Sequence, residues 1–488
     1  MSFDPARRRF LNQATVAAGT VVAASLLSPE RALAASLPPE WQMGFADVDA
    51  DIAPAAMRLV YGRAPVGLSG RLYRNGPAKF RRAGGSAGHW FDGDGFIRRF
   101  RLHDGTAELA ARFVDTPKRR MEEKANAMIV PGFGTPAGAN VRLGNNDDAS
   151  AANTSVMMVG DDLWALWEAG SPMRIDPDTL ATRGFRTLGE GMAHMPFLAH
   201  PRIEPDGRVW NLGQSGTRAI VWELAKDGTM IAATPIELPR ASYIHDFTAT
   251  DRHLVLVLQP WVHGRDAFPI IDSLAWRPEI GTQVLVLDKS DLTRRRVFEL
   301  PAFSFFHLGD GWEERDGTIR FDACIEHDPA FAASAARELI RGHLTPTPLP
   351  MLAMIALHPG GRGELLSTRV AAEFPRSDAR RAGLARRYTI HTGLYRGGPM
   401  ARGLGVFDWQ TGRDAAFDFG DRQIVEEFVF VPGGTGENEG WLVGNTLNLA
   451  AGATELHAFR AADVAAGPVA TWRADMALPI GFHGNFVA

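Results

Sequence analysis

Four of the fourteen histidines in this chain stand out because each follows an apolar or aromatic stretch. They are His200 in LAHPRIEPDG, His245 in YIHDF, His307 in FSFFHLGDGWEE and His483 in GFHGNF. Such flanks predict buried imidazoles, and a buried imidazole needs a partner for each ring nitrogen. Either each is a separately satisfied core residue, or all four bind one metal ion. The gaps of 45, 62 and 176 residues match no local ligand motif, but a shared metal accounts better for four such histidines.

The composition excludes several classes of protein. The chain has 488 residues, of which 45% are hydrophobic and 22% charged, which is typical of a globular protein. The formal net charge is −4 and no long basic run occurs in the body, so nucleic-acid binding is not expected. The single cysteine, Cys324, excludes an internal disulfide and a zinc or iron–sulfur site built on cysteines of this chain. Any metal must therefore be held by histidine or carboxylate.

Residues 1–34 have the pattern of an export signal. Three arginines at 7–9 precede an uncharged stretch from 14 to 28, and Ala32-Leu33-Ala34 offers a cleavage site. The apolar part is too short for a comfortable membrane span. The order Arg7-Arg8-x-Phe10-Leu11 resembles a twin-arginine signal, although a general secretory signal is the alternative. We therefore expect a mature domain at 35–488 located in the periplasm.

The elements that must position the histidines are strands. After residue 40, short apolar runs alternate with clusters of Gly, Pro, Asp and Asn, as in a protein of strands and turns. A loose unit of strand, acidic turn and strand recurs as MRIDPDTLAT, VLVLDKSDLTRRRVF, LGVFDWQTGRDAAF and LHAFRAADVAAGPVATW. Repeated antiparallel hairpins favour an all-β β-propeller, whose length would allow seven blades with inserted loops. A pair of β-sandwiches is the alternative.

Three segments depart from this pattern. Residues 330–341 (AFAASAARELIR) have helical propensity. Residues 344–357 (LTPTPLPMLAMIAL) are apolar and interrupted by proline, and we favour a connection buried between blades over part of an apolar substrate patch. The stretch 127–137 (AMIVPGFGTPA) carries the same two interpretations.

Nine segments of the chain, in this order, form a specific pattern, although no single one is decisive. They are YRNGPAKF (73–80), HWFDGDGFIRRF (89–100), ANTSVMMVGDDLWALWEAGSPMRIDPDTLAT (152–182), AHPRIEPDG (199–207), IHDF (244–247), FFHLGDGWEE (305–314), EFPR (373–376), EFVFVPGG (427–434) and GFHGNFV (481–487). Through these segments the chain resembles, from Tyr73 to Ala488, the carotenoid cleavage oxygenases, which include lignostilbene dioxygenases and retinoid isomerases.

This resemblance implies a seven-bladed propeller, a helical and loop cap, and one axial Fe(II) per chain. The iron ligands it implies are His200, His245, His307 and His483. It also implies that three glutamates hold ligands from behind, which by local match are Glu168, Glu373 and Glu427, with Glu427 preferred over the adjacent Glu426. Neutral imidazoles suit ferrous iron and four of them leave two octahedral positions vacant. Glutamates that accept the outer N–H fix each tautomer and balance the charge. Which glutamate pairs with which histidine stays open.

Two positions depart from the family pattern. Asp310 stands where an asparagine is usual, so it either adds negative charge near His307 or points to solvent. Phe428 stands where a proline is usual after the third glutamate. Neither change removes an expected ligand.

The implied activity is oxidative cleavage of a C=C bond of a carotenoid or apocarotenoid by O2, which gives two carbonyl products. Trp167 stands where the lignostilbene branch often has lysine, and this favours an apolar polyene over a phenolic stilbene. Trp167 is therefore the candidate for the substrate pocket, with simple core packing as the alternative. Stilbene cleavage, and a non-catalytic propeller that binds an apolar ligand, are the competing functions. Peripheral membrane contact is left open.

Overall fold

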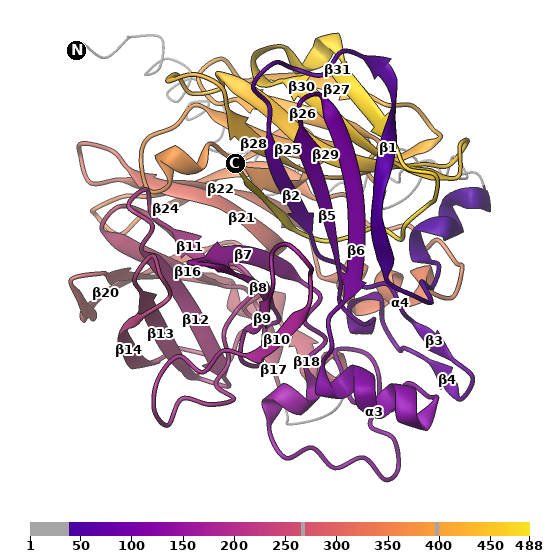
Figure 1. Cartoon of the computed structure of the whole chain (residues 1–488). Helices are drawn as coiled ribbons and strands as arrows, with labels where there is room; N and C mark the ends of the chain where they lie inside the picture. Colours follow the sequence, from indigo (N-terminus) through magenta and orange to yellow (C-terminus); the bar gives the residue numbers. More distant parts are fainter. Residues whose placement is uncertain (1–38, 265–268, 396–399) are drawn as a thin grey trace.

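The protein is all-β, and its strands form seven antiparallel blades around an axis (Figure 1). The structure is a computed structural model that describes residues 39–264, 269–395 and 400–488. The predicted signal sequence at 1–34 lies outside these residues. The propeller expected from the repeated hairpins is confirmed, and the alternative of two sandwiches is wrong, because the blades follow one another around a closed ring. The described helices are short, and none is long and apolar enough to cross a membrane.

Blades 1 to 4 use strands between residues 52 and 300, together with β32 from the C-terminal end of the described chain. In each blade the strand nearest the axis comes first in the following order. The strands are β32 (Gly484–Val487), β2 (Gly70–Arg74), β5 (Phe96–His103), β6 (Thr106–Phe113) and β1 (Ile52–Gly62) in blade 1; β7 (Ser155–Val159), β8 (Asp162–Leu166), β9 (Met173–Ile175) and β10 (Thr182–Phe185) in blade 2; β11 (Arg202–Ile203), β12 (Val209–Ser215), β13 (Arg218–Leu224) and β14 (Met230–Glu237) in blade 3; and β15 (Thr248–Ala249), β16 (His253–Leu258), β19 (Thr282–Asp288) and β20 (Asp291–Leu300) in blade 4.

Blades 5 to 7 follow in chain order. The strands are β21 (Ser304–Glu313), β22 (Ile319–Glu326), β23 (Met351–Leu357) and β24 (Gly363–Arg376) in blade 5; the end of β24 with β25 (Tyr388–Gly393), β26 (Gly403–Asp408) and β27 (Arg413–Asp418) in blade 6; and β28 (Gln423–Pro432), β29 (Gly440–Asn448), β30 (Ala453–Arg460) and β31 (Pro468–Arg473) in blade 7. The four recurring sequence units are the outer hairpins of blades 2, 4, 6 and 7, which confirms the repeat.

Strands shared between blades tie the ring together. The first part of β24 is the outer strand of blade 5, and its end, from Ala372, pairs with β25 as the inner strand of blade 6. Likewise β1 pairs with β6 of blade 1 and with β31 of blade 7. The ring is closed by β32, which pairs antiparallel with β2 although the two strands lie near opposite ends of the described chain.

The hydrophobic core is divided into clusters between adjacent blades. Successive strand residues point to opposite faces, so neighbours such as Leu72 and Tyr73 on β2 pack against blade 7 and blade 2 respectively. Each of the seven interfaces between adjacent blades has its own buried cluster. This packing fixes the inner strands, which carry the candidate site.

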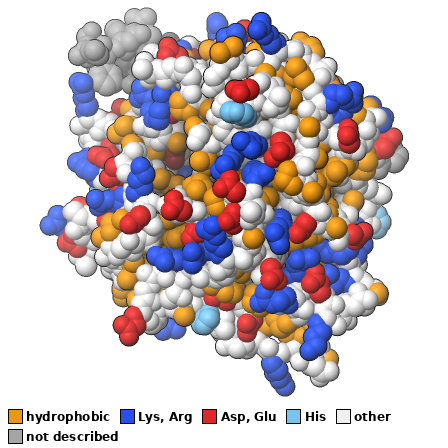
Figure 2. Space-filling model, in the orientation of Figure 1, with side chains coloured by type: hydrophobic (Ala, Val, Ile, Leu, Met, Phe, Trp, Pro, Cys, Tyr) orange, Lys and Arg blue, Asp and Glu red, His pale blue; other side chains and the backbone are white. Residues whose placement is uncertain are grey.

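Short helices and two short hairpins lie outside the blades. They are η1 (Pro39–Phe45), η2 (Trp90–Asp92), α3 (Pro117–Ala125), η3 (Asn146–Ala149), η4 (Ile270–Ser273), η5 (Pro278–Ile280), η6 (Phe331–Ala335), α4 (Ala336–Leu339), η7 (Ala379–Arg381), η8 (Ala461–Ala466), and the hairpins β3 (Arg81–Arg82) with β4 (Gly85–Ser86) and β17 (Trp261–His263) with β18 (Leu274–Trp276). Residues of η2, α3, η4 and η6 line the pocket described below. The helix predicted at 330–341 is confirmed as η6 and α4. On the face drawn in Figure 2, charges of both signs are interspersed with hydrophobic side chains.

The two apolar segments at 344–357 and 127–137 both contribute residues to the pocket, and the first also forms a strand. The preference for a buried connection at 344–357 is wrong for its second half, which is β23, a full strand of blade 5. The preceding residues 347–350 line the large apolar pocket described below. Gly132 and Phe133, within 127–137, line the same pocket. Both segments therefore contribute to the apolar patch that was the second interpretation.

Candidate metal centre

The four candidate histidines converge at the axis from four different blades. His200 precedes β11, His245 precedes β15, His307 lies on β21 and His483 precedes β32. One ligand nitrogen of each lies within 4.8 Å of those of the other three. The Nε2 atoms of His200 and His245 are 3.0 Å apart, and the ring centroids of His200 and His483 are 4.5 Å apart. Segments up to 283 residues apart in sequence thus form one cluster that could hold a metal ion.

Three glutamates from the remaining three blades lie behind these imidazoles. Glu168 follows β8, Glu373 lies on β24 and Glu427 lies on β28. Each blade therefore contributes one residue to the site. The pairing that the sequence left open is Glu168 with His245, Glu373 with His307, and Glu427 with His483, each through Nδ1 of the histidine. Among the described residues, no carboxylate pairs with His200.

The hydrogen bonds set the direction of each imidazole. When a carboxylate accepts the Nδ1–H, the Nε2 lone pair is free to face the axis, which is the arrangement a metal ligand needs. The Nε2 atom of His307 is buried and has no hydrogen-bond partner among the described residues. An orphaned nitrogen of this kind is costly unless something binds it. The donor set therefore fits a metal ion that accepts neutral imidazole nitrogens.

Burial favours the neutral form of two of the four histidines, His200 and His483. Burial lowers the pKa of His200 well below its usual range, and positive charge on the other three histidines would lower it further. Burial also lowers the pKa of His483 to about 3, against the opposing effect of Glu427. For His307 burial lowers the pKa, but the Glu373 carboxylate outweighs this effect and the net shift is upward. Metal binding would displace that proton.

Glu427 is held as a carboxylate by a network that sequence reasoning missed. Its Oε2 atom accepts a hydrogen bond from Arg74 at 2.8 Å, and Arg376 lies 3.4 Å from Oε1. Burial would raise the pKa of Glu427, but Arg376, His483 and Arg74 hold it well below its usual range. The adjacent Glu426 binds Arg98 and also Arg74, so the two glutamates share one arginine. They lie where the β28–β29 pairing is irregular, between Val425 and Phe428.

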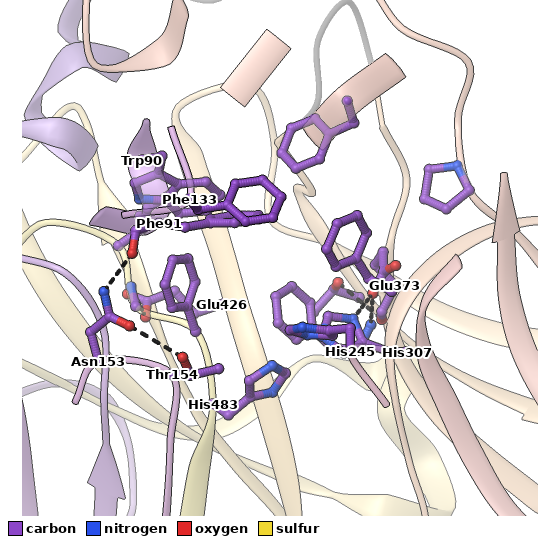
Figure 3. Close-up of a pocket in the computed structure, with 18 of the residues that line it drawn as sticks. Trp90, Phe91, Phe133, Asn153, Thr154, His245, His307, Glu373, Glu426 and His483 are labelled. Atoms are coloured by element: carbon purple, nitrogen blue, oxygen red, sulfur yellow. Dashed lines mark hydrogen bonds and ion pairs between the residues drawn. The ribbon is translucent and has the colours of Figure 1, made fainter. Parts of the chain in front are cut away.

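Aromatic side chains cover the other side of the site. Figure 3 shows Trp90, Phe91 and Phe133 across the pocket from His245, His307 and His483. The aromatic residues that line this pocket are Trp90, Phe91, Phe133, Trp167, Tyr243, Phe306, Phe331, Phe374, Tyr395 and Phe482. Trp167 therefore lines the pocket, as expected of a substrate-pocket residue. The site opens onto a mainly apolar space that could hold an apolar ligand.

Two aromatic residues reach the site in ways the sequence did not reveal. Tyr243 donates a hydrogen bond from its hydroxyl to Glu168 at 3.0 Å, so Glu168 binds both Tyr243 and His245. Phe374 follows Glu373 with φ of 55°, a left-handed conformation rare for a bulky residue. Its ring stacks on His307 with centroids 5.0 Å apart. The irregular β24–β25 pairing at this point aims both Glu373 and Phe374 at the site.

The two departures from the family pattern have structural explanations. The carboxylate of Asp310 is bound by Arg202 and Ser377. Burial raises the pKa of Asp310, but Arg202 and Arg386 reverse this effect and the net shift is downward. Phe428 packs in the cluster between blades 6 and 7. Neither residue contacts the four histidines.

Comparison with known proteins agrees with this geometry. The family model described as "RPE65: Retinal pigment epithelial membrane protein" matches residues 45–488. The chain belongs to this family, that of the carotenoid cleavage oxygenases.

Family members of known name align over nearly the whole chain. The apocarotenoid-15,15'-oxygenase of Synechocystis is 28% identical and aligns with 92% of this chain and 94% of its own. The resveratrol cleavage oxygenase 1 of Aspergillus fumigatus is 26% identical over 88% of this chain and 91% of its own. A solved structure of a Synechocystis apocarotenoid oxygenase mutant superposes with a TM-score of 0.81 at 25% identity, over 92% of this chain and 99% of that one. These matches support the seven-bladed fold.

Proposed function

We propose that this protein is a non-haem Fe(II) dioxygenase that cleaves a C=C bond of a carotenoid or apocarotenoid. The reaction is R–CH=CH–R′ + O2 → R–CHO + R′–CHO, so both oxygen atoms enter the products and no reductant is needed. The observation that carries the proposal is the set of four convergent histidines, three of them held by glutamates, beside an apolar aromatic pocket.

Iron fits the donor set. Four neutral imidazoles without a thiolate or a directly bound carboxylate suit a divalent transition metal, and they leave positions vacant in an octahedral shell. Bound Fe(II) would supply the redox chemistry that activates O2. The chain supplies the rest: Glu168, Glu373 and Glu427 orient the imidazoles, and Arg74 keeps Glu427 charged. The aromatic wall would exclude water and align an apolar substrate beside the metal.

Stilbene cleavage is the alternative because a relative named for resveratrol cleavage aligns over most of this chain. The pocket wall favours the polyene. Trp167 presents an indole there, which offers apolar surface and one N–H rather than an ammonium group. A relative named for apocarotenoid cleavage has similar identity, so the side chains of the pocket are the better guide.

The test is aerobic incubation of iron-loaded protein with a panel of carotenoids, apocarotenoids and hydroxystilbenes, with products identified by mass. We expect about one iron per chain, oxygen-dependent bleaching of a polyene, and two carbonyl products that each gain one oxygen atom from labelled O2. Faster loss of a hydroxystilbene would favour the alternative. Protein that retains no iron and turns over neither class would be a binding module.

Export to the periplasm is a separate part of the proposal. It rests on the twin-arginine pattern at residues 7–11 and the cleavage site at 32–34. A twin-arginine route carries folded proteins, which would allow the metal to be loaded before export. Replacement of Arg7 and Arg8 by lysine should retain the protein in the cytoplasm, as measured by cell fractionation. Unchanged export would indicate the general secretory route.

A further inference from the structure

Four glutamates line the pocket. Glu168 and Glu373 bind histidines and Glu426 binds arginines, which leaves Glu326 without a charged partner among the contacts described. Glu326 ends β22, is 6% exposed and lines the same pocket as His307 and Glu373. Its Oε2 atom is buried and has no hydrogen-bond partner among the described residues. Buried polar atoms in native proteins are nearly always satisfied, so this oxygen is able to form a hydrogen bond with a group that enters the pocket.

The surroundings of Glu326 keep it uncharged. Burial raises the pKa of its carboxyl well above the usual range, and the carboxylates of Glu373 and Asp328 raise it further. Tyr395 lines the same pocket, and burial together with Glu373, Cys324 and Glu326 raises the pKa of its phenol. The carboxyl of Glu326 and the phenol of Tyr395 are therefore both favoured in their uncharged forms in the lining of a mainly apolar space.

A protonated carboxyl group has a defined hydrogen-bonding capacity. It can donate one hydrogen bond through its O–H and accept another through its carbonyl oxygen. A hydroxyl group matches both functions, and an aldehyde or ketone oxygen matches the donor. A hydrocarbon end leaves the acid unsatisfied in the dry pocket, which costs free energy. A carboxylate end would instead meet the negative field of Glu373.

We propose that Glu326 binds a neutral oxygen function, a hydroxyl or carbonyl group, at one end of the substrate. Glu326 is thus a specificity-determining residue, and the substrate class is an oxygenated polyene rather than a pure hydrocarbon carotene. This inference rests on the proposed function, because it takes the apolar pocket as the substrate site. Residues 347–350 line the pocket with Glu326 and would pack against the polyene near its oxygenated end.

The test uses three polyenes of equal chain length that end in a methyl, a hydroxyl or an aldehyde group. Binding is followed by quenching of tryptophan fluorescence, since Trp90 and Trp167 line the pocket, and cleavage is measured in parallel. We expect wild type to prefer the oxygenated ligands. Glu326→Leu should lose about 10- to 100-fold of that preference, whereas Glu326→Gln, which keeps a neutral donor and acceptor, should retain it.

Matched controls separate this effect from general damage. Cys324→Ala changes another buried residue of β22 and should leave the preference intact. Metal content should be equal in all variants. Equal binding of the three polyenes by wild type, or a preference that Glu326→Leu leaves unchanged, would overturn the inference even if cleavage proceeds. A preference in binding that Glu326→Leu removes would sustain it even if no polyene is cleaved, an outcome in which only the proposed dioxygenase activity fails.

Discussion

Two buried glutamates near the same pocket, one behind His483 and one in the lining, are held in opposite states. On β28, Glu427 is 1% exposed, and Arg74, Arg376 and His483 keep its pKa far below the usual range. At the end of β22, Glu326 is 6% exposed, and burial beside other carboxylates raises its pKa. Burial is nearly equal, so the partners decide the chemistry. A carboxylate with cationic neighbours can hold a metal ligand, whereas an unpaired acid stays neutral and offers a hydrogen bond to a ligand.

The largest effect should follow from removing a histidine on the metal side. His245→Ala deletes one of the four convergent nitrogens and leaves Glu168 without its imidazole. We expect the variant to lose iron retention and cleavage completely, as measured by metal analysis and polyene bleaching. Retention of one iron per chain with normal turnover would show that the cluster is not the metal site.

The comparison between the two kinds of glutamate is tested by one substitution at two positions. Glu373→Gln weakens the hydrogen bond that orients His307, so iron affinity or activity should fall ~10–100-fold. Glu326→Gln lies in the same pocket and should leave iron affinity unchanged. Competition with a chelator measures both affinities. Equal losses would mean that Glu326 also supports the metal.

The residues of the metal site could be predicted from the sequence, but their pairing and the role of Glu326 could not. The four histidines and three paired glutamates follow from local motifs, because apolar flanks and family segments mark them individually. The pairing could not be predicted, since it depends on which blades face one another across the axis. The left-handed Phe374 and the isolation of Glu326 are properties of three-dimensional packing. In CIEHD, Glu326 looks like any polar residue that ends a strand.

A change on the opposite wall should alter substrate choice more gently. Trp167→Lys replaces an apolar wall with an ammonium group that can bind a phenolic hydroxyl. We expect the ratio of stilbene to polyene cleavage to rise roughly tenfold, as a hydrogen bond to a charged group would give. Parallel kcat/KM measurements on a hydroxystilbene and a carotenoid provide the ratio. Unchanged relative rates would remove Trp167 from the determinants of specificity.

The smallest effect concerns stability and pH. The folded state keeps the Glu326 proton above the ordinary pKa of 4.5, where the unfolded chain releases it, so the free energy of unfolding falls as pH rises. The slope from this group is at most about 1.4 kcal/mol per pH unit. The carboxylates of Glu373 and Asp328 raise the pKa of the Glu326 carboxyl, and the phenol of Tyr395 interacts electrostatically with it. Glu326→Gln should therefore gain stability over wild type at pH 8 and none at pH 4.

Urea midpoints of both proteins at several pH values measure this difference. If the urea midpoints of wild type and Glu326→Gln differ by the same amount at every pH, Glu326 does not hold a proton in the folded state. The Cys324→Ala variant should show no pH-dependent difference between pH 4 and pH 7, because the wild-type thiol is protonated in both the folded and the unfolded state there.

Closure of the ring by β32 has a consequence for biogenesis. His483 immediately precedes this strand, and Gly484 also donates its backbone N–H to Glu427. A nascent chain whose synthesis has reached only the end of blade 7 would contain three of the histidines. It would lack His483 and the strand β32, which pairs with β2 of blade 1. Stable metal capture would then report that synthesis and assembly of the whole propeller are finished, so incomplete translation products would remain metal-free and inactive.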